Sequence, residues 1–228
     1  MSIDPNNPKT WPGLRPVPII AHDVGRARDR STAVVGGNSP FQSGIIGIDK
    51  LEELPQGLFG SQRASALAKV DRLYNNNCLI VADLSNDATY AEVLFEVFGP
   101  RVIGLHITRN ADGMHFEQRL VKNGVIRVYT IGRSFLLELF HARLQARQIR
   151  FADDPNTKRA CEQLVALQTE MTETETLYRC ARGQHDDLAI SCAMLVWAAA
   201  HPHLPDWFRP IEDARRPRRD NFGWGAFV

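Results

Sequence analysis

Short apolar runs alternate along this chain with longer segments in which apolar residues recur at helical spacing. Runs of strand length occupy residues 17–23, 31–37, 43–54, 78–84 and 101–107. Helical spacing predicts helices within residues 61–76 and 87–99, the first capped by Ser61 and the second ended by Gly99. The resulting order is three strands, a helix, a strand, a helix and a strand. We therefore expect an α/β domain in which helices flank a mixed sheet.

The second half of the chain continues with both kinds of pattern. Asn123 and Gly124 separate two apolar segments and predict a type I′ hairpin. Helices are expected over residues 133–147, 156–170 and 186–200, and the last of these is so apolar that it must be buried. We expect residues 1–16 to be an extended lead-in, residues 17–200 to be the folded domain, and residues 201–228 to be a tail rich in Pro and Arg.

Composition limits the cellular setting more than it limits the activity. The 228 residues are 44% hydrophobic, enough for one substantial core. The start of the chain lacks the pattern of a signal peptide, and its longest apolar run is shorter than the roughly 18 residues of a membrane span. Four cysteines without CxxC spacing suggest small core residues in a reducing compartment, with no zinc site: Cys78, Cys161, Cys180 and Cys192. We expect a soluble cytoplasmic protein with no membrane partner.

Four carboxylates stand at three places where strands end or a helix begins. Asp23 and Asp83 each close an apolar strand, and Asp186 and Asp187 open the buried last helix. Two divalent cations about 3.5 to 4 Å apart can clamp both sides of a phosphoryl displacement, and convergent carboxylate oxygens are the ligands that such hard ions prefer. These acids therefore predict a site for two hard divalent cations, and with it a metal-dependent nuclease.

Each acid also has a simpler interpretation. Asp23 and the nearby Asp29 could only shape a polar turn, although Asp29 could also point back to the site. Asp83, Ser85 or Asn86 could cap the following helix. One acid at a helix N-terminus is ordinary because the helix dipole favours it. Two adjacent acids repel each other, which favours a cation at Asp186 and Asp187, although solvent could also screen a surface pair. His185 could bond to phosphate or water, or only orient its neighbours.

Arginine dominates the cations, with 22 Arg against 5 Lys at a net charge of +1. The planar guanidinium suits contact with phosphate. Arg26, Arg28 and Arg30 follow Asp23 closely and are the best candidates for contact with double-stranded DNA. The alternative is a solvated turn.

Three segments in this order resemble the nuclease domain of phage large terminase subunits, which belongs to the RuvC-like branch of the ribonuclease H superfamily. They are "HDVGRARDRSTAVV", "IVADLSNDATYAEVL" and "LYRCARGQHDDLAISCAMLVWAA". The resemblance covers residues 17 to 200. It implies a ribonuclease H-like fold, cutting of concatemeric viral DNA during packaging, and two Mg²⁺ or Mn²⁺ ions held at Asp23, Asp83 and the pair Asp186 and Asp187. Within that pair, the family pattern of Asp followed by x-Leu-Ala-Ile favours Asp186.

Two departures from the family leave other functions open. The chain has no G-x-x-x-x-G-K-[ST] motif, so we expect it to lack an ATPase motor and to work with a separate packaging ATPase, a small terminase subunit or a portal. The segment after Asp83 also lacks the glycines that the family often carries there. Alternatives are a nuclease similar to Holliday-junction resolvases and a catalytically inactive DNA-binding packaging accessory of a phage or prophage.

Overall fold

Eight strands form one mixed sheet in a computed structural model that describes residues 4–10, 17–25, 30–87, 89–109, 114–171, 176–180 and 186–208. In space the strands follow the order β6-β7-β5-β4-β1-β2-β3-β8. Strands β1, β4, β5 and β7 are parallel neighbours, whereas β2 and β6 run antiparallel to the strands beside them. Their bounds are β1 Ile19–Asp23, β2 Thr32–Asn38, β3 Ile46–Glu53, β4 Leu79–Asp83, β5 Val102–Thr108, β6 His115–Val121, β7 Gly124–Gly132 and β8 Ile149–Phe151.

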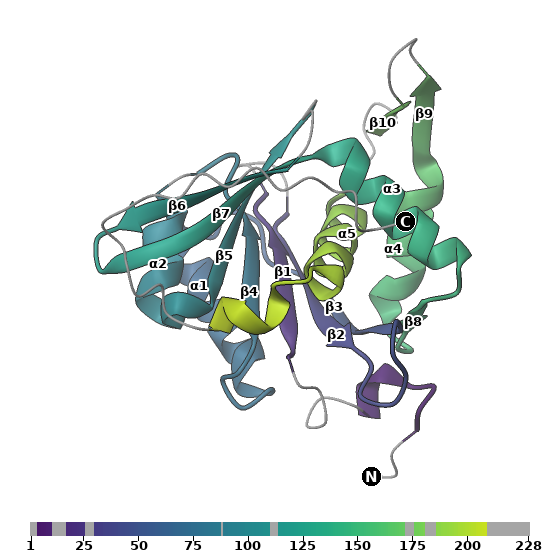
Figure 1. Ribbon diagram of the computed structural model, residues 1–228, viewed down its shortest axis with the longest axis horizontal. Coiled ribbons are helices and arrows are strands. Elements are labelled where there is room, and N and C mark those ends of the chain that lie inside the picture. The colour runs from purple at the N-terminus through teal and green to yellow at the C-terminus, as the bar shows by residue number, and fades with distance from the viewer. Residues whose placement is uncertain are drawn as a thin grey trace.

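Helices cover both faces of this sheet (Figure 1). Helices α1 (Gly60–Arg72) and α2 (Tyr90–Phe98) lie on one side, and α3 (Arg133–Gln145), α4 (Pro155–Ala166) and α5 (Asp187–Ala200) lie on the other. A separate hairpin of β9 (Leu167–Met171) and β10 (Thr176–Cys180) connects α4 to α5. Short 3₁₀ helices occupy Pro8–Thr10 (η1), Gly99–Arg101 (η3) and Leu204–Phe208 (η4).

Strand alternation divides the core into two layers. Along β1, Ile19 and Ala21 pack in the layer that contains α5, while Ile20 packs in the layer that contains α1 and α2. Every side chain of α5 from Leu188 to Ala199 is buried, as its apolar sequence requires. Successive residues of a strand face opposite layers of the core. The position of the last residue in this alternation therefore determines which layer its side chain faces.

The expected α/β class is confirmed, and so are the five early strands and most helix positions. The expected Ser61 cap is wrong. Helix α1 begins one residue earlier, with Phe59 at the N-cap position, where the Gln62 side chain accepts a hydrogen bond from the Phe59 backbone N–H at 2.9 Å. The helix expected over residues 156–170 ends at Ala166, because the chain turns there into β9.

The hairpin at Asn123 and Gly124 forms, but not with the expected turn. Val121 pairs with Gly124, so Lys122 and Asn123 are the two turn residues, and neither has the positive φ that a type I′ turn requires. Gly124 serves packing instead. A Cβ atom there would lie 2.3 Å from the Phe95 ring of α2.

Packing against the core continues past residue 200. Trp207 of η4 is 1% exposed, and its indole N–H donates a hydrogen bond to the Tyr129 hydroxyl of β7 at 3.0 Å. Near the start of the chain, Pro8 of η1 is also buried. No helix within the described residues is long and apolar enough to cross a membrane.

Candidate active site

Asp23 and Asp83 end two neighbouring parallel strands. The register of β1 and β4 runs from Ile19 opposite Leu79 to His22 opposite Ala82, and the two aspartates are the next residue on each strand. Neighbouring strands lie about 4.8 Å apart. Both aspartates also share their face with strand residues that pack in the layer of α5, namely Ile19, Ala21, Leu79 and Val81. The fold therefore places both carboxylates at one edge of the sheet and on one face.

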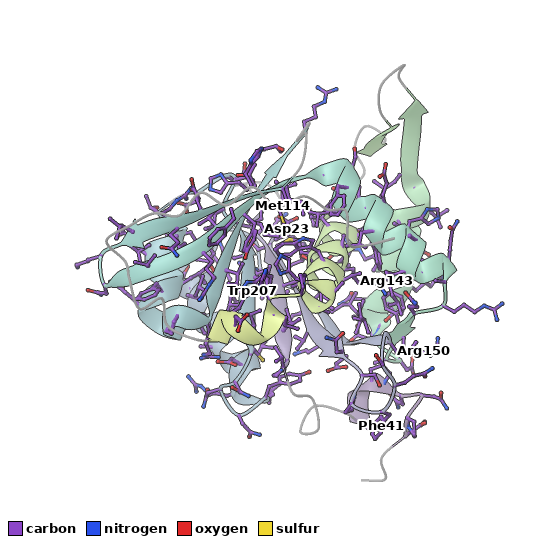
Figure 2. All side chains as sticks on the ribbon, in the orientation of Figure 1. Asp23, Phe41, Met114, Arg143, Arg150 and Trp207 are labelled. Atoms are coloured by element: carbon purple, nitrogen blue, oxygen red, sulfur yellow. The ribbon has the colours of Figure 1, made fainter. Side chains whose placement is uncertain are left out.

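The first turn of α5 is tied to the same edge. Thr32 of β2 pairs with Asp23, and its hydroxyl donates to the backbone carbonyl of Asp187 at 3.1 Å. The same hydroxyl is 2.6 Å from the Ser191 hydroxyl, one turn further along α5. Figure 2 labels Asp23 beside the beginning of α5. The backbone of Asp187 is thus fixed next to the strand residue that faces Asp23.

A side chain from another helix caps the start of α5. The Gln163 side-chain oxygen, from α4, accepts the backbone N–H groups of Leu188 at 2.9 Å and Ala189 at 3.2 Å. Asp186 occupies the N-cap position, yet its side chain makes no capping hydrogen bond. The side chain of Gln163, and not that of Asp186, therefore satisfies the free N–H groups at the start of α5.

Asp186 instead forms an ion pair with Arg133, the first residue of α3. The Asp186 side chain is 14% exposed and that of Arg133 is 33% exposed, so the pair is partly shielded from water. Among the described residues, Arg133 thus places a positive charge beside Asp186, one of the four predicted site acids.

Asp83 is held in a different way. It is 7% exposed, and one carboxylate oxygen accepts hydrogen bonds from the backbone N–H of Ser85, at 2.8 Å, and from the Ser85 hydroxyl. Burial raises the pKa of Asp83, and the two hydrogen bonds from Ser85 oppose that shift. The start of α2 is served by the Asp87 carboxylate, which accepts the N–H groups of Thr89 and Tyr90. The alternative in which Asp83 caps α2 is therefore wrong.

The carboxylate oxygens of these aspartates suit a hard divalent cation, although the described side chains do not form a complete coordination site. No group of three or more His, Cys, Asp or Glu side chains among residues with described positions is close enough to hold a metal ion. The aspartates nevertheless offer the oxygen ligands that such ions prefer, and Asp83 is desolvated as an anion without a described cation partner. A cation near Asp83 would stabilise the charge that burial disfavours.

The other predicted site residues are only partly covered by the described structure. Arg26, Arg28, Asp29 and His185 lie outside the described residues. Arg30 is described, and its guanidinium forms an ion pair with the Glu53 carboxylate at 2.9 Å. The same Glu53 oxygen accepts Arg159 at 2.8 Å.

Sequence reasoning missed several residues that shape this site. Arg133 begins a predicted helix, where a cation opposes the helix dipole, and that unfavourable placement was a usable signal. Gln163 carried no signal, because nothing in its own helix marks it as the cap of another. His106 of β5 lies near Asp83. Its pKa is lowered by burial and by Arg119, while Glu117 and Asp83 oppose the shift.

The fold and the acids at one sheet edge define an α/β protein of the ribonuclease H-like class. Comparison with models of known protein families and with curated proteins gives no match. Among solved structures, the chain is similar to the large terminase nuclease of thermophilic phage G20c with bound magnesium. That comparison has a TM-score of 0.55 and 20% identity, and covers 81% of this chain and 83% of that chain.

Two further structures give similar values. The nuclease domain of the large terminase from Thermus phage P74-26 has a TM-score of 0.51 and 17% identity, and 82% of each chain is covered. The human cytomegalovirus terminase nuclease domain, soaked with Mn and bound to an inhibitor, has a TM-score of 0.54 and 13% identity, with 92% of this chain and 94% of that chain covered. At these identities the likeness establishes the fold, and the resemblance inferred from the sequence is confirmed at that level.

Proposed function

We propose that the protein is a metal-dependent DNA endonuclease of the large-terminase type, which cuts concatemeric viral DNA during genome packaging. The observation that carries this proposal is the placement of Asp23 and Asp83 at adjacent parallel strand ends, on the face that α5 covers. The fold shared with terminase nucleases, one of them solved with magnesium and another soaked with Mn, supports it.

In this proposal Asp23, Asp83 and the pair Asp186 and Asp187 hold two Mg²⁺ or Mn²⁺ ions. When bound, such ions supply activation of a water for in-line attack and stabilisation of the leaving 3′ oxygen. Asp83 would contribute a rigid ligand, because Ser85 fixes one of its oxygens. Ligation through Asp186 requires its carboxylate to exchange Arg133 for a metal ion, whereas ligation through Asp187 leaves that ion pair intact.

The proposed substrate is double-stranded DNA. Arg26, Arg28 and Arg30 would contact its phosphates, and Arg30 would have to leave Glu53 to do so. Asp29 and His185 are proposed accessory residues beside the metal ligands. We also propose that a packaging ATPase, a small terminase subunit or a portal brings the DNA to this nuclease.

The direct test is cleavage of supercoiled plasmid with Mn²⁺ or Mg²⁺. The parent protein should produce nicked and linear DNA, and Asp83→Asn should slow cleavage by at least about 100-fold, because it removes a charge that holds the cation. Glu162→Gln is the matched control, since it removes one charge from an exposed acid on α4. Equal rates for the parent and Asp83→Asn would contradict the proposal. DNA binding without cleavage by the parent would leave only the accessory role.

A further inference from the structure

A cavity of about 440 Å³ opens at the carboxyl ends of β1 and β4, on the opposite face of the sheet from the candidate active site. Val24 and Gly25, which directly follow the end of β1, line it together with Asn86, three residues after the end of β4. Phe59 and Arg63 line it from the start of α1. The volume lies within the range of about 300–1,000 Å³ that is typical of small-molecule sites. One pair of strand ends therefore separates the cavity from the acids.

Arg63 provides the positive charge of this cavity. Its Nε donates to the Leu58 carbonyl at 2.9 Å, and its guanidinium carbon lies 5.6 Å from the centre of the Tyr90 ring. Its Nη1 is buried with no hydrogen-bond partner, and no ion pair joins Arg63 to a carboxylate within the described ranges. Arg63 is thus a positioned cation without a described counter-ion, which is the environment that an anion would complete.

The other ionisable groups near Arg63 leave its charge in place. Burial, with a smaller contribution from Arg63, lowers the pKa of His22 to about 4, so that His22 is neutral at pH 7. Asp87 also lines the cavity, but its Oδ1 accepts the Thr89 hydroxyl at 2.6 Å and two backbone N–H groups at the start of α2. The carboxylate of Asp87 therefore serves the helix.

Phe59 supplies an aromatic surface at the same cavity. Its side chain is 75% exposed, although the fold buries most large apolar residues. Gln62 holds its backbone N–H at 2.9 Å, which fixes the residue at the N-cap position of α1. An exposed ring beside an unpaired guanidinium is the combination with which proteins bind single-stranded nucleic acid, because the base stacks and the phosphate pairs with the cation.

We propose that this cavity binds one unpaired nucleotide of the DNA strand next to the cleavage point, with its phosphate on Arg63 and its base stacked on Phe59. The inference rests on the proposed endonuclease function. In it, a DNA strand crosses the edge of the sheet, with the phosphate to be cut on the face that carries the aspartates and the unpaired nucleotide in the cavity on the other face. A base within an intact duplex has no free face for Phe59. The site therefore selects DNA that is frayed or single-stranded beside the cut.

The test measures binding in the Asp83→Asn background with EDTA, so that cleavage does not interfere. Fluorescence anisotropy compares a blunt duplex with the same duplex carrying single-stranded extensions of five thymidines. Phe59→Ala should weaken binding of the extended DNA about 10-fold and leave blunt DNA unchanged. Arg63→Gln should weaken binding and lower the salt slope for extended DNA by about 0.7, the value for one phosphate of a single strand. Two controls of similar chemistry away from the cavity, Leu120→Ala and Arg72→Gln, should bind both DNAs as the background protein does.

A spectroscopic measurement reports stacking directly. A 2-aminopurine base in the extension should lose fluorescence when the protein binds, and Phe59→Ala should abolish that loss. Because Arg63 packs on Tyr90, each variant is checked by thermal melting, and Arg63→Lys keeps the charge if Arg63→Gln unfolds. Parent-like binding and quenching by Phe59→Ala would overturn the nucleotide site. If the parent cuts plasmid in that case, the endonuclease proposal stands alone. If the parent does not cut but the variants lose extended DNA, the endonuclease proposal fails and the cavity remains a site for single-stranded DNA.

Discussion

The two ends of β4 hold buried carboxylates in opposite ways. Before the amino end of β4, one carboxylate oxygen of Asp71 accepts a hydrogen bond from the Cys78 backbone N–H at 2.8 Å. The Arg101 guanidinium donates hydrogen bonds to both oxygens of Asp71, at 3.3 and 3.0 Å. At its carboxyl end, Asp83 accepts hydrogen bonds from Ser85 and from the backbone of Ile107, but no Lys or Arg among the described residues forms an ion pair with it, and burial raises its pKa. One strand thus connects a carboxylate with a full set of partners to one without a described cation.

This contrast separates an acid that stabilises the fold from one that is costly to the fold. A buried anion with a bidentate arginine repays its desolvation, whereas a buried anion without a cation does not. An anion of the second kind is stabilised when a cation or a substrate completes its environment. The difference therefore favours the carboxyl end of β4, and not its amino end, as the place where a cation or substrate would bind.

Replacing Arg101 with Gln should have the largest effect on stability. The change leaves Asp71, whose side chain is 3% exposed, without its cation, so the free energy of unfolding should fall by about 3 kcal/mol. Urea denaturation measures this loss. The control Lys158→Gln breaks a pair that is 87% and 63% exposed and should cost less than about 0.5 kcal/mol. Cleavage per folded molecule should stay at the parent rate, and a selective loss of cleavage would erase the contrast between the two ends.

Metal binding should act only through the carboxyl end. Added Mn²⁺ should raise the free energy of unfolding of the parent by about 2.7 kcal/mol at 100 times its Kd. Asp83→Asn should show almost no response, while Glu162→Gln should respond as the parent does. Differential scanning fluorimetry across a Mn²⁺ titration provides the measurement. A full response from Asp83→Asn would remove Asp83 from the proposed ligand set.

Arg133→Gln tests the intermediate case, an acid with a partly exposed cation. Loss of the ion pair should lower the free energy of unfolding in EDTA by about 1–2 kcal/mol, less than for Arg101 because Arg133 is 33% exposed. The same change removes a competing positive charge and should tighten Mn²⁺ binding in a calorimetric titration. Arg150→Gln on β8 is the control. Weaker Mn²⁺ binding in Arg133→Gln would show that Arg133 supports the ligands instead of competing with the metal.

The smallest expected effect is on how the free energy of unfolding depends on pH. Burial raises the pKa of Asp83 above 3.8, so the folded state favours the protonated acid and loses stability as pH rises through the shifted pKa. In EDTA, Asp83→Asn should therefore be more stable than the parent at pH 7 and no more stable below pH 3.8. Thermal melts across that range measure the difference. A constant difference at every pH would mean that the charge of Asp83 is not its cause.

Local patterns predicted the elements of this fold, but not the contacts between distant residues. The runs ending at Asp23 and Asp83 revealed both strand ends, because buried strands are continuously apolar. Neither the strand order nor the Gln163 cap of α5 leaves a local trace, since both depend on residues far apart in the chain. Strand β8, three residues long, was missed because it is too short for a periodic signal.

The hydrogen bond between Cys78, the residue before β4, and Asp71 also affects the direction of the Asp83 side chain. The run Leu79 to Ala82 is buried on both faces, so a slip of one residue would carry almost no hydrophobic penalty. Such a slip would turn the Asp83 carboxylate toward α1 and away from Asp23. The hydrogen bond from the Cys78 backbone N–H to the Asp71 carboxylate, at 2.8 Å, opposes such a slip. A hydrogen bond at Cys78, five residues before Asp83, thus helps to fix the register of β4, and the direction of the Asp83 carboxylate is set before the strand begins.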